Sequence, residues 1–385
     1  MEAPRLKLAG RPFTGCLLAL ALACGARDPH EISQSGAGAH EVSLAVVDDG
    51  FVASWYDDRD GNAEIYIRRL DAAGDPAGPE LRLTTDPALS YEPDVTPFES
   101  DIAIGWYERS GDALTPRLGR WSVDGQVRWT VQVAPAGRNV VVRGSGDRLF
   151  AAWVEDDDTN RATVWGGWWA HDGKPIGDPI HLAIAGRTTW NLNADVDASG
   201  VPWVAYDAKA GTRAEELFLV RGDGAAPPRQ LTADDGVPSK YPDVAFNGKA
   251  MAVTWFEERD SNEDVFVAVV SVDDDAPLST KHQVTRNPGE SIGAYLAWAG
   301  DRVGVAWSDE IDGQHDVHFQ AFDPQGQPLG ERRRITDSAA SSLIPAIRAH
   351  NGRFALAWTE YRPGDSGGGH GPVARSEIAF TLIDP

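Results

Sequence analysis

Apolar and polar residues alternate along most of the chain, in short runs that each end in an aromatic residue. Residues 51–55 (Phe-Val-Ala-Ser-Trp) and 251–255 (Met-Ala-Val-Thr-Trp) are two such runs. A period of two residues predicts a β-strand with one buried side. The closing aromatic recurs 47 to 53 residues apart, at Trp55, Trp106, Trp153, Tyr206, Trp255, Trp307 and Trp358. No segment shows a sustained apolar period of 3.6 residues, so the pattern predicts an all-β fold.

The repeating unit of about 50 residues contains more than this one strand. A polar turn and a second β-pattern follow each aromatic, as in residues 63–68, 264–270 and 316–322. A turn rich in Gly and Pro comes next, and a short strand with a branched residue or Leu closes the unit. One further strand precedes the strand that ends in the aromatic residue. The pattern therefore predicts four strands per unit.

The short fourth strand shows how the repeats close. Its branched or Leu position recurs at Ile32, Leu83, Val133, Leu182, Leu231, Val284 and Ile335. The first of these precedes the first aromatic, whereas the last unit reaches Pro385 without a fourth strand of its own. Residues 30–33 (His-Glu-Ile-Ser) align with residues 282–285 (His-Gln-Val-Thr). We therefore predict one domain over residues 30–385, a seven-bladed β-propeller whose last blade is completed by the N-terminal strand.

Composition narrows the range of partners. The chain has 385 residues, 35 Lys plus Arg against 58 Asp plus Glu, and a formal net charge of −23. Nucleic acids and anionic membrane surfaces attract basic proteins, so no nucleic-acid partner is expected. The two cysteines, Cys16 and Cys24, both lie near the N-terminus, so no disulfide framework is expected in the propeller.

The N-terminal segment resembles a targeting signal. Arg5, Lys7 and Arg11 precede an apolar run over residues 13–23, which is shorter than the roughly 20 residues of a membrane-spanning helix. Residues 21–24 (Ala-Leu-Ala-Cys) resemble the lipobox of bacterial lipoproteins. We expect residues 1–23 to be a signal peptide, Cys24 to carry a lipid anchor, and residues 24–29 to form a short tether to a bacterial cell envelope. Secretion without an anchor and a cytoplasmic location are the alternatives.

The clearest hairpin carries a family resemblance. Residues 55–66 (Trp-Tyr-Asp-Asp-Arg-Asp-Gly-Asn-Ala-Glu-Ile-Tyr) resemble the WD40-like repeats of TolB-type periplasmic propellers. The repeat is also similar to those of Trp-rich bacterial surface lipoproteins. Residues 259–262 match more weakly and the other units depart from the pattern. The resemblance implies a propeller in the cell envelope and implies no particular partner.

Carboxylates recur two residues after the aromatic, at Asp57, Glu108, Glu155, Glu257, Asp309 and Glu360. One interpretation is structural, with these acids accepting hydrogen bonds from turn amides or pairing with Arg59, Arg259 and Arg362. The other is functional, with the negative field attracting a cation, a basic protein segment or a polyhydroxy ligand.

A second set of acids is predicted to lie at the start of the innermost strand, around the mouth of the central channel. It comprises Asp94, Asp195 and Asp243, with Tyr295 at the corresponding position of another blade. These are the stronger binding candidates, since only some blades carry them. A binding protein should also expose the loop aromatics Tyr91, Trp190, Tyr241 and Tyr295 around this mouth.

Blade 1 contains a candidate metal loop. Asp58, Asp60, Asn62 and Glu64 alternate as oxygen donors around Gly61, in a spacing similar to that of calcium loops. The twelve-residue calcium pattern is incomplete, and an Asp-Gly-Asn hairpin turn accounts for the same residues. No cofactor is expected otherwise.

The leading functional hypothesis is a lipid-anchored binding or scaffolding module for an envelope protein or a glycan. The alternative is a glycoside hydrolase of sialidase type, because residues 122–129 resemble the Asp-box of sialidases. Arg59, Arg259, Arg362, Tyr361 and Glu360 are its candidate site residues, although their repeat-equivalent positions favour a structural role. A hydrolase should show a deep pocket with two carboxylates, one with a strongly raised pKa.

Overall fold

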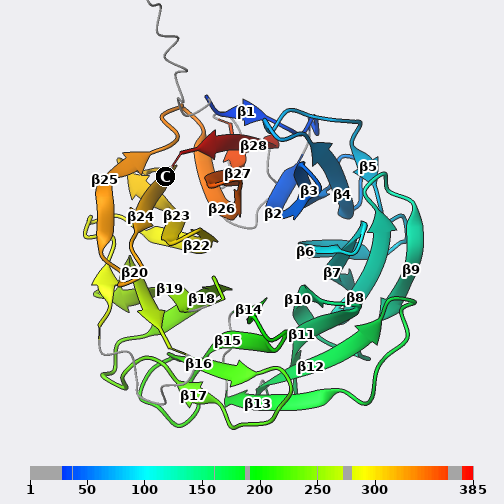
Figure 1. Cartoon of the computed structure of the whole chain (residues 1–385), viewed down its shortest axis with the longest axis horizontal. Helices are drawn as coiled ribbons and strands as arrows, with labels where there is room; N and C mark the ends of the chain where they lie inside the picture. The colour runs from blue at the N-terminus through cyan, green and yellow to red at the C-terminus, as the bar shows by residue number, and fades with distance from the viewer. Residues whose placement is uncertain are drawn as a thin grey trace, which may run out of the picture.

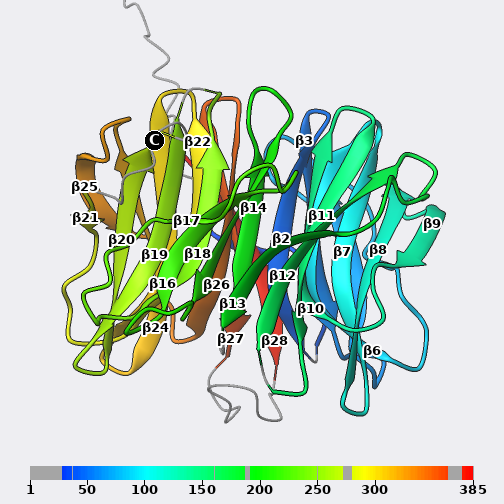
Figure 2. The same cartoon turned by 90° about the horizontal axis from the view of Figure 1, so that it is seen from below.

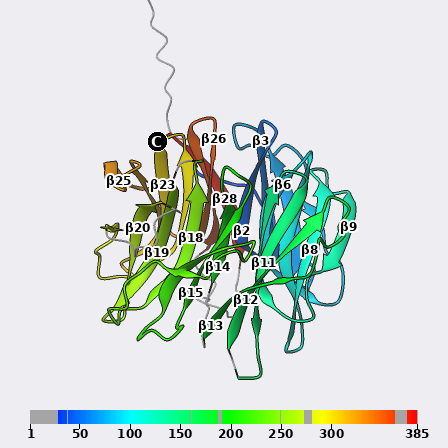
Figure 3. The same ribbon diagram turned by 60° about the horizontal axis from the view of Figure 1, so that its bottom comes forward.

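The structure, a computed structural model, describes residues 28–36, 38–159, 161–186, 191–248, 250–271, 280–362 and 375–384. These residues form seven four-stranded antiparallel sheets arranged as blades around a central axis (Figure 1). Seen from the side, the strands stand steeply along the axis of the ring (Figure 2), and an oblique view shows the same arrangement (Figure 3). The predicted seven-bladed β-propeller is therefore confirmed. Within the described ranges, no helical segment has the length and apolar character that a membrane crossing requires.

Each blade begins with its innermost strand. Blade 1 contains β2 (Ala39–Val47), β3 (Gly50–Asp57), β4 (Glu64–Leu70) and β5 (Leu81–Arg82). Blade 2 contains β6 (Leu89–Phe98), β7 (Asp101–Ser110), β8 (Ala113–Ser122) and β9 (Val127–Gln132). Blade 3 contains β10 (Arg138–Ser145), β11 (Arg148–Asp156), β12 (Ala162–Ala170) and β13 (Ile180–Gly186). Blade 4 contains β14 (Leu192–Val196), β15 (Pro202–Ala208), β16 (Glu216–Arg221) and β17 (Arg229–Gln230).

The remaining blades follow the same order. Blade 5 contains β18 (Ser239–Phe246), β19 (Met251–Arg259), β20 (Asn262–Val270) and β21 (His282–Gln283). Blade 6 contains β22 (Ser291–Ala299), β23 (Arg302–Ile311), β24 (Gln314–Phe322) and β25 (Pro328–Arg334). Blade 7 contains β26 (Ser341–His350), β27 (Arg353–Tyr361), β28 (Ser376–Ile383) and, from the N-terminus, β1 (His30–Glu31).

The ring closes through the N-terminal strand. β1 pairs antiparallel with β28, with His30 opposite Phe380, and the two strands lie side by side at the outer edge of blade 7 (Figure 1). The Ile32 amide then donates to the Ile378 carbonyl at 2.7 Å, and the Ile32 side chain is fully buried. The predicted closure is confirmed in the register that the repeat alignment indicated.

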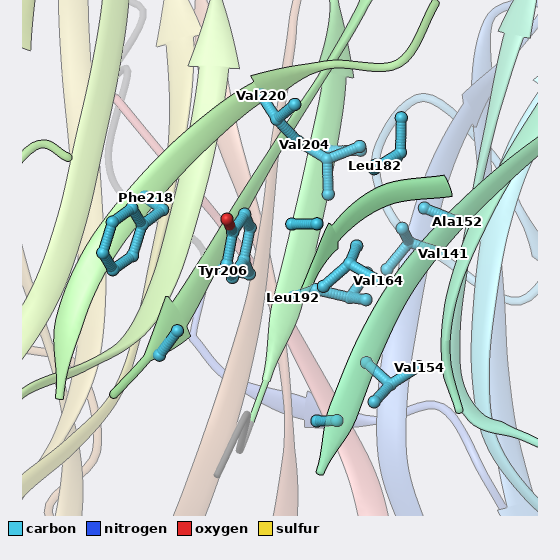
Figure 4. Packing of buried hydrophobic residues seen from close by; sticks show 14 of the residues in the cluster. Val141, Ala152, Val154, Val164, Leu182, Leu192, Val204, Tyr206, Phe218 and Val220 are labelled. Carbon is cyan, nitrogen blue, oxygen red and sulfur yellow. The ribbon is translucent and has the colours of Figure 1, made fainter. Parts of the chain in front are cut away.

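The alternating pattern of the sequence becomes a series of apolar layers between neighbouring blades. The aromatic that defines the repeat is fully or almost fully buried in every blade. Figure 4 shows one layer, in which Val141 and Val164 of blade 3 face Leu192 and Val204 of blade 4. Burying one such side chain contributes about 1.5–3 kcal/mol, so the blade interfaces are a main source of stability.

Most innermost strands contain a bulge near their first residues. The pairing register shifts there, and one residue adopts a positive φ, at Glu41, Glu92, Asn139, Tyr241, Gly293 and Ile344. In blade 4 the pairing of β14 with β15 runs without a shift from Leu192 to Val196. A bulge inserts one residue and turns the side chains that follow to the other face of the strand.

Candidate functional site

One face of the ring carries the loops from the second to the third strand of each blade and the connections between blades. We call it the loop face. Asn62, in the loop 58–63, donates from its side-chain amide to the carbonyls of Asp86 and Ala88 at 3.1 and 3.0 Å. The two kinds of loop in blade 1 are thus joined on this face.

In blades 1, 3, 5 and 7 the carboxylate two residues after the key tryptophan accepts a hydrogen bond from that tryptophan. The indole N–H donates to Asp57 at 3.1 Å in blade 1, and the corresponding bonds reach Glu155 at 3.0 Å, Glu257 at 3.4 Å and Glu360 at 2.7 Å. Arg59 also pairs with Asp57 at 2.5 Å and Arg259 with Glu257 at 2.8 Å. These contacts match the structural interpretation of the repeated acids, and the indole donor was not foreseen.

One predicted arginine has a different partner. Arg362 forms its ion pair with Glu31 of β1 and not with the acid of its own hairpin, so it supports ring closure. Tyr361 hydrogen-bonds to His40 at 3.1 Å, and Glu360 binds Trp358. The five candidates of the sialidase hypothesis are therefore distributed over blades 1, 5 and 7 in contacts of different kinds.

The predicted channel acids link neighbouring blades. The Asp94 carboxylate accepts the backbone N–H of Val142 at 2.8 Å, and Asp243 accepts that of Leu296 at 2.8 Å. Asp195 accepts the N–H of Phe246 at 2.8 Å. Each bond runs from one innermost strand to the innermost strand of the next blade. Burial raises the pKa of Asp243 to about 6 and also raises that of Asp195.

The register corrects the position of Asp195. Asp94, Asp243 and Tyr295 lie opposite the residue that precedes the key aromatic, and in blade 4 the same position is held by Asn193. Asp195 pairs with Trp203, two residues deeper into the channel. The expected single column is therefore two tiers, because Asp195 lies next to the end of β14, closer to the turn into β15 than Asp94 and Asp243 lie to the turns that follow them.

The deeper tier contains two arginines that the sequence analysis missed. Arg143 bridges three blades, since it pairs with Asp94 at 2.5 Å and donates to the Ala194 carbonyl at 2.6 Å and the Asn193 side chain at 2.8 Å. Arg348 occupies the equivalent position of blade 7. Burial, together with the charge of Arg143, lowers the pKa of Arg348. The channel is thus crossed by a network of arginine and aspartate side chains.

Tyrosines gather above this network. The structure places a group of aromatic and acidic side chains from blades 7, 1 and 2 in contact on the loop face, which we call the mouth cluster. Its members are His40, Glu41, Tyr56, Tyr91, Glu92, Tyr107 and Tyr361. His40 stacks on Tyr56 with ring centroids 5.1 Å apart, and Tyr56 meets Tyr91 edge-on at 5.1 Å. Tyr91 contacts Tyr107 at 5.8 Å.

Two glutamates of the mouth cluster lie at the bulges of β2 and β6. Glu92 accepts a hydrogen bond from the Tyr107 hydroxyl at 3.2 Å. Burial, and then the nearby charge of Glu92, raise the pKa of Glu41 to about 8. Glu41 is therefore largely protonated at neutral pH. The alternating pattern does not show where the bulges lie, so Glu41 and Glu92 were not predicted as site residues.

The remaining predicted aromatics extend the surface. Tyr295 lies at the upper tier of blade 6, and the charges of Asp243, Glu41 and Glu92 act on its phenol, whose pKa is raised mainly by burial. Tyr241, at the bulge of blade 5, stacks on Phe256 at 5.1 Å and is 38% exposed. Trp190 and Cys24 lie outside the described residues.

The candidate calcium loop of blade 1 is occupied by protein contacts. Asp60 receives the Tyr66 hydroxyl and Arg82 at 3.0 Å. The Asn62 side-chain amide donates from its nitrogen to Glu64 at 3.0 Å, so this nitrogen, which cannot bind Ca²⁺, faces another of the four candidate ligands. Glu64 is buried and also binds Arg82 at 2.7 Å. These contacts match the hairpin interpretation of the same residues.

Two cavities on the surface lie apart from the mouth cluster. One of about 440 Å³ is lined by Thr159, Arg161, Gly186, Lys209, Gly211 and Thr212. Another of about 330 Å³ lies beside β1 and is lined in part by His30, Glu31 and Trp358. The acids and tyrosines of the channel line neither of them.

Comparisons with known proteins place the chain by its fold. No family model and no curated protein matches the sequence. Among solved structures, the chain is similar to the polysaccharide lyase Uly1, with a TM-score of 0.55, 11% identity and 90% of each chain covered. It is also similar to a PL25 ulvan lyase bound to -[GlcA(1-4)Rha3S]-, with a TM-score of 0.63, 9% identity, and 92% of this chain and 95% of that chain covered.

A third similar structure is the β-propeller domain of the trilobed protease from Pyrococcus furiosus, described as having an open velcro topology. Its TM-score is 0.51 at 9% identity, over 90% of this chain and 94% of that chain. At these identities the likeness extends to the fold alone, and the shared fold hosts unrelated functions. The comparisons therefore identify this chain as a β-propeller.

Proposed function

We propose that this protein binds a glycan at the mouth cluster and the adjoining Tyr241 and Tyr295. The observation that carries the proposal is the gathering of tyrosine rings around Glu41 and Glu92 on one face of the ring. Tyrosine rings offer flat apolar surfaces with a polar edge, and carboxyl groups exchange hydrogen bonds with hydroxyls. A polyhydroxylated ligand uses both kinds of contact.

The same proposal includes a place in the cell. The basic and apolar N-terminal segment and the lipobox-like residues 21–24 support attachment to a bacterial envelope through a lipid on Cys24. A glycan-binding ring held at a membrane surface would meet polysaccharides of the envelope or its surroundings. An envelope protein remains the second kind of ligand to be tested.

Glycan cleavage is a second candidate, and one observation favours it. Glu41 holds its proton near neutral pH beside Glu92 and several phenols, as a general acid requires. Neither of the two cavities described above is lined by these groups. Binding is therefore the leading proposal.

The test is capture on a panel of immobilised neutral, uronate-containing and sulfated polysaccharides. The chain without residues 1–24 is compared with Glu92→Gln and Tyr241→Ala variants. The matched control is Val127→Ala, which alters a side chain that is 61% exposed on β9, far from the channel. We expect at least one polysaccharide to be retained by the parent and the control, and about tenfold less by the two site variants.

Equal retention of all four proteins, or of none, would reject the mouth cluster as a glycan site. Cleavage is scored in the same samples by new reducing ends and by ultraviolet absorbance of unsaturated uronic acids. Products that disappear in Glu41→Gln would favour the second candidate over simple binding.

A further inference from the structure

A hairpin at the loop face of blade 6 positions a carboxylate and an imidazole side by side. Glu310 near the end of β23 is the cross-strand partner of His315 near the start of β24. The turn between them has positive φ at Asp312 (55°) and Gly313 (81°), a combination that suits a tight two-residue hairpin. Direct cross-strand partners have their side chains on the same face of the sheet.

The loop that enters blade 6 adds a second carboxylate. The Glu310 amide donates to the Glu290 carbonyl at 2.8 Å. Gly289 allows this approach, because a Cβ atom there would lie 2.3 Å from the Glu310 carbonyl oxygen. The backbone thus holds Glu290 against the hairpin without relying on side-chain contacts.

The three side chains have the spacing of metal ligands. One oxygen from each glutamate and one nitrogen of His315 all lie within 4.8 Å of one another. Zinc binds nitrogen and carboxylate oxygen at about 2.0–2.2 Å in a tetrahedral arrangement, so two of its ligand atoms are about 3.4 Å apart. The three atoms would have to approach one another by up to about 1.4 Å, which rotation about the side-chain torsions of the two glutamates can supply.

A second observation points to a ligand for the imidazole. The His315 Nε2 atom is buried and has no hydrogen-bond partner in the described part of the chain. Buried polar atoms are almost always satisfied, so this nitrogen calls for a partner. Glu290 is exposed and Glu310 is half-buried, so both carboxylates are accessible to an ion from solution.

The surrounding charge favours a cation. Glu263, near the start of β20, lies within range of the charges of both Glu290 and Glu258. Lys240 forms its ion pair with Glu258 at 2.7 Å and not with the three candidate ligands. A divalent cation would relieve this crowding of negative charge.

We propose that Glu290, Glu310 and His315 form a site for a divalent transition metal, with Zn²⁺ as the best match. Imidazole favours zinc over calcium or magnesium, and two carboxylates complete three protein ligands. The fourth position is left to water or to an oxygen of a bound ligand. The site is separate from the mouth cluster, so it does not depend on the proposed glycan binding.

The experiment is a titration of the chelator-treated full chain with Zn²⁺, and with Co²⁺ for its visible absorption. We expect one Zn²⁺ per chain, a Zn²⁺-dependent rise of the unfolding temperature, and a Co²⁺ spectrum of four-coordinate type. His315→Ala and Glu310→Gln should each weaken Zn²⁺ binding at least tenfold. Asp312→Asn is the matched control, since it removes a charge from the same hairpin and asparagine tolerates positive φ.

Unfolding curves without metal identify any variant that fails to fold, and two ligand variants keep the test usable if one does. Zn²⁺ binding that is equal in Asp312→Asn, His315→Ala and Glu310→Gln would overturn the site. Absence of Zn²⁺ uptake by the parent chain, or a response to Ca²⁺ alone, would overturn it as well. A change in metal binding with unchanged glycan capture leaves the proposed function standing.

Discussion

The Ser33 hydroxyl donates to the Glu377 carboxylate at 2.5 Å, across 344 residues of sequence. The same oxygen accepts the Ile378 amide at 2.7 Å. Blades 1, 4, 5 and 6 use a threonine in this position against an acid near the start of the third strand, as Thr84 does with Glu64 and Thr336 with Asp316. The N-terminal segment therefore reproduces, in blade 7, a contact that blades 1, 4, 5 and 6 form within themselves.

Ser33→Ala should weaken the closure of the ring. The substitution leaves a buried carboxylate and a buried amide each without one partner, at a cost of about 1–3 kcal/mol in the free energy of unfolding. Urea denaturation followed by tryptophan fluorescence measures it. Ser100→Ala, at an exposed turn, should stay within about 0.5 kcal/mol of the parent. Equal effects of the two changes would contradict a closing role for Ser33.

Asp94→Ala should be strongly destabilising. Arg143 would lose its carboxylate partner while its side chain stays only 13% exposed, and breaking a buried pair in this way costs about 3 kcal/mol. The double variant Asp94→Ala/Arg143→Met should recover part of that loss, because the unpaired charge is gone. Thermal unfolding of the single and double variants gives the comparison. A double variant less stable than Asp94→Ala would argue against an unpaired charge as the cause.

Glu41 should make stability depend on pH. Its pKa rises from an ordinary 4.5 to about 8 in the folded protein, so folding favours the protonated form. The stability that this provides is fully present below about pH 4.5 and is lost as the pH rises through about 8. Glu41→Gln should therefore be more stable than the parent at about pH 9, with the difference shrinking toward about pH 5.

The control for that change is Glu331→Gln, an exposed glutamate of β25. Its stability should follow the parent at every pH. If Glu41→Gln shows the same pH profile as the parent, the raised pKa of Glu41 is wrong.

A comparison of two tryptophans measures how much the indole hydrogen bond contributes to the free energy of unfolding. Trp358 and Trp307 are both fully buried, but Trp358 donates to Glu360 at 2.7 Å whereas the Trp307 N–H has no partner among the described residues. Replacement by Phe removes similar volume in both blades. Trp358→Phe should thus cost about 1 kcal/mol more than Trp307→Phe in the free energy of unfolding. A larger cost for Trp307→Phe would show that packing, not the hydrogen bond, separates the two sites.

The sequence pattern predicted the repeat, the number of blades and the closing strand, because each depends on periodic burial. It did not predict the bulges, since Glu41 and Tyr241 adopt positive φ without the glycine that usually marks it. Asp195 was assigned to the wrong tier because the pattern did not give the register of the β14–β15 hairpin. Arg143 and Arg348 were missed because the sequence around a single charged residue in an apolar strand does not indicate which residues of other blades it will contact.

The pairing of β1 with β28 has a consequence for biosynthesis. β1 is among the first segments of the ring to leave the ribosome, and β28, its eight-residue mate, is the last strand of the described chain. The sheets of blades 1 to 6 can form before the ring closes. The N-terminal strand β1 can pair only after β28, the last strand, has been synthesised. A polypeptide released prematurely would carry an unmatched edge at each end, which exposes it to proteolysis and to pairing with other nascent chains.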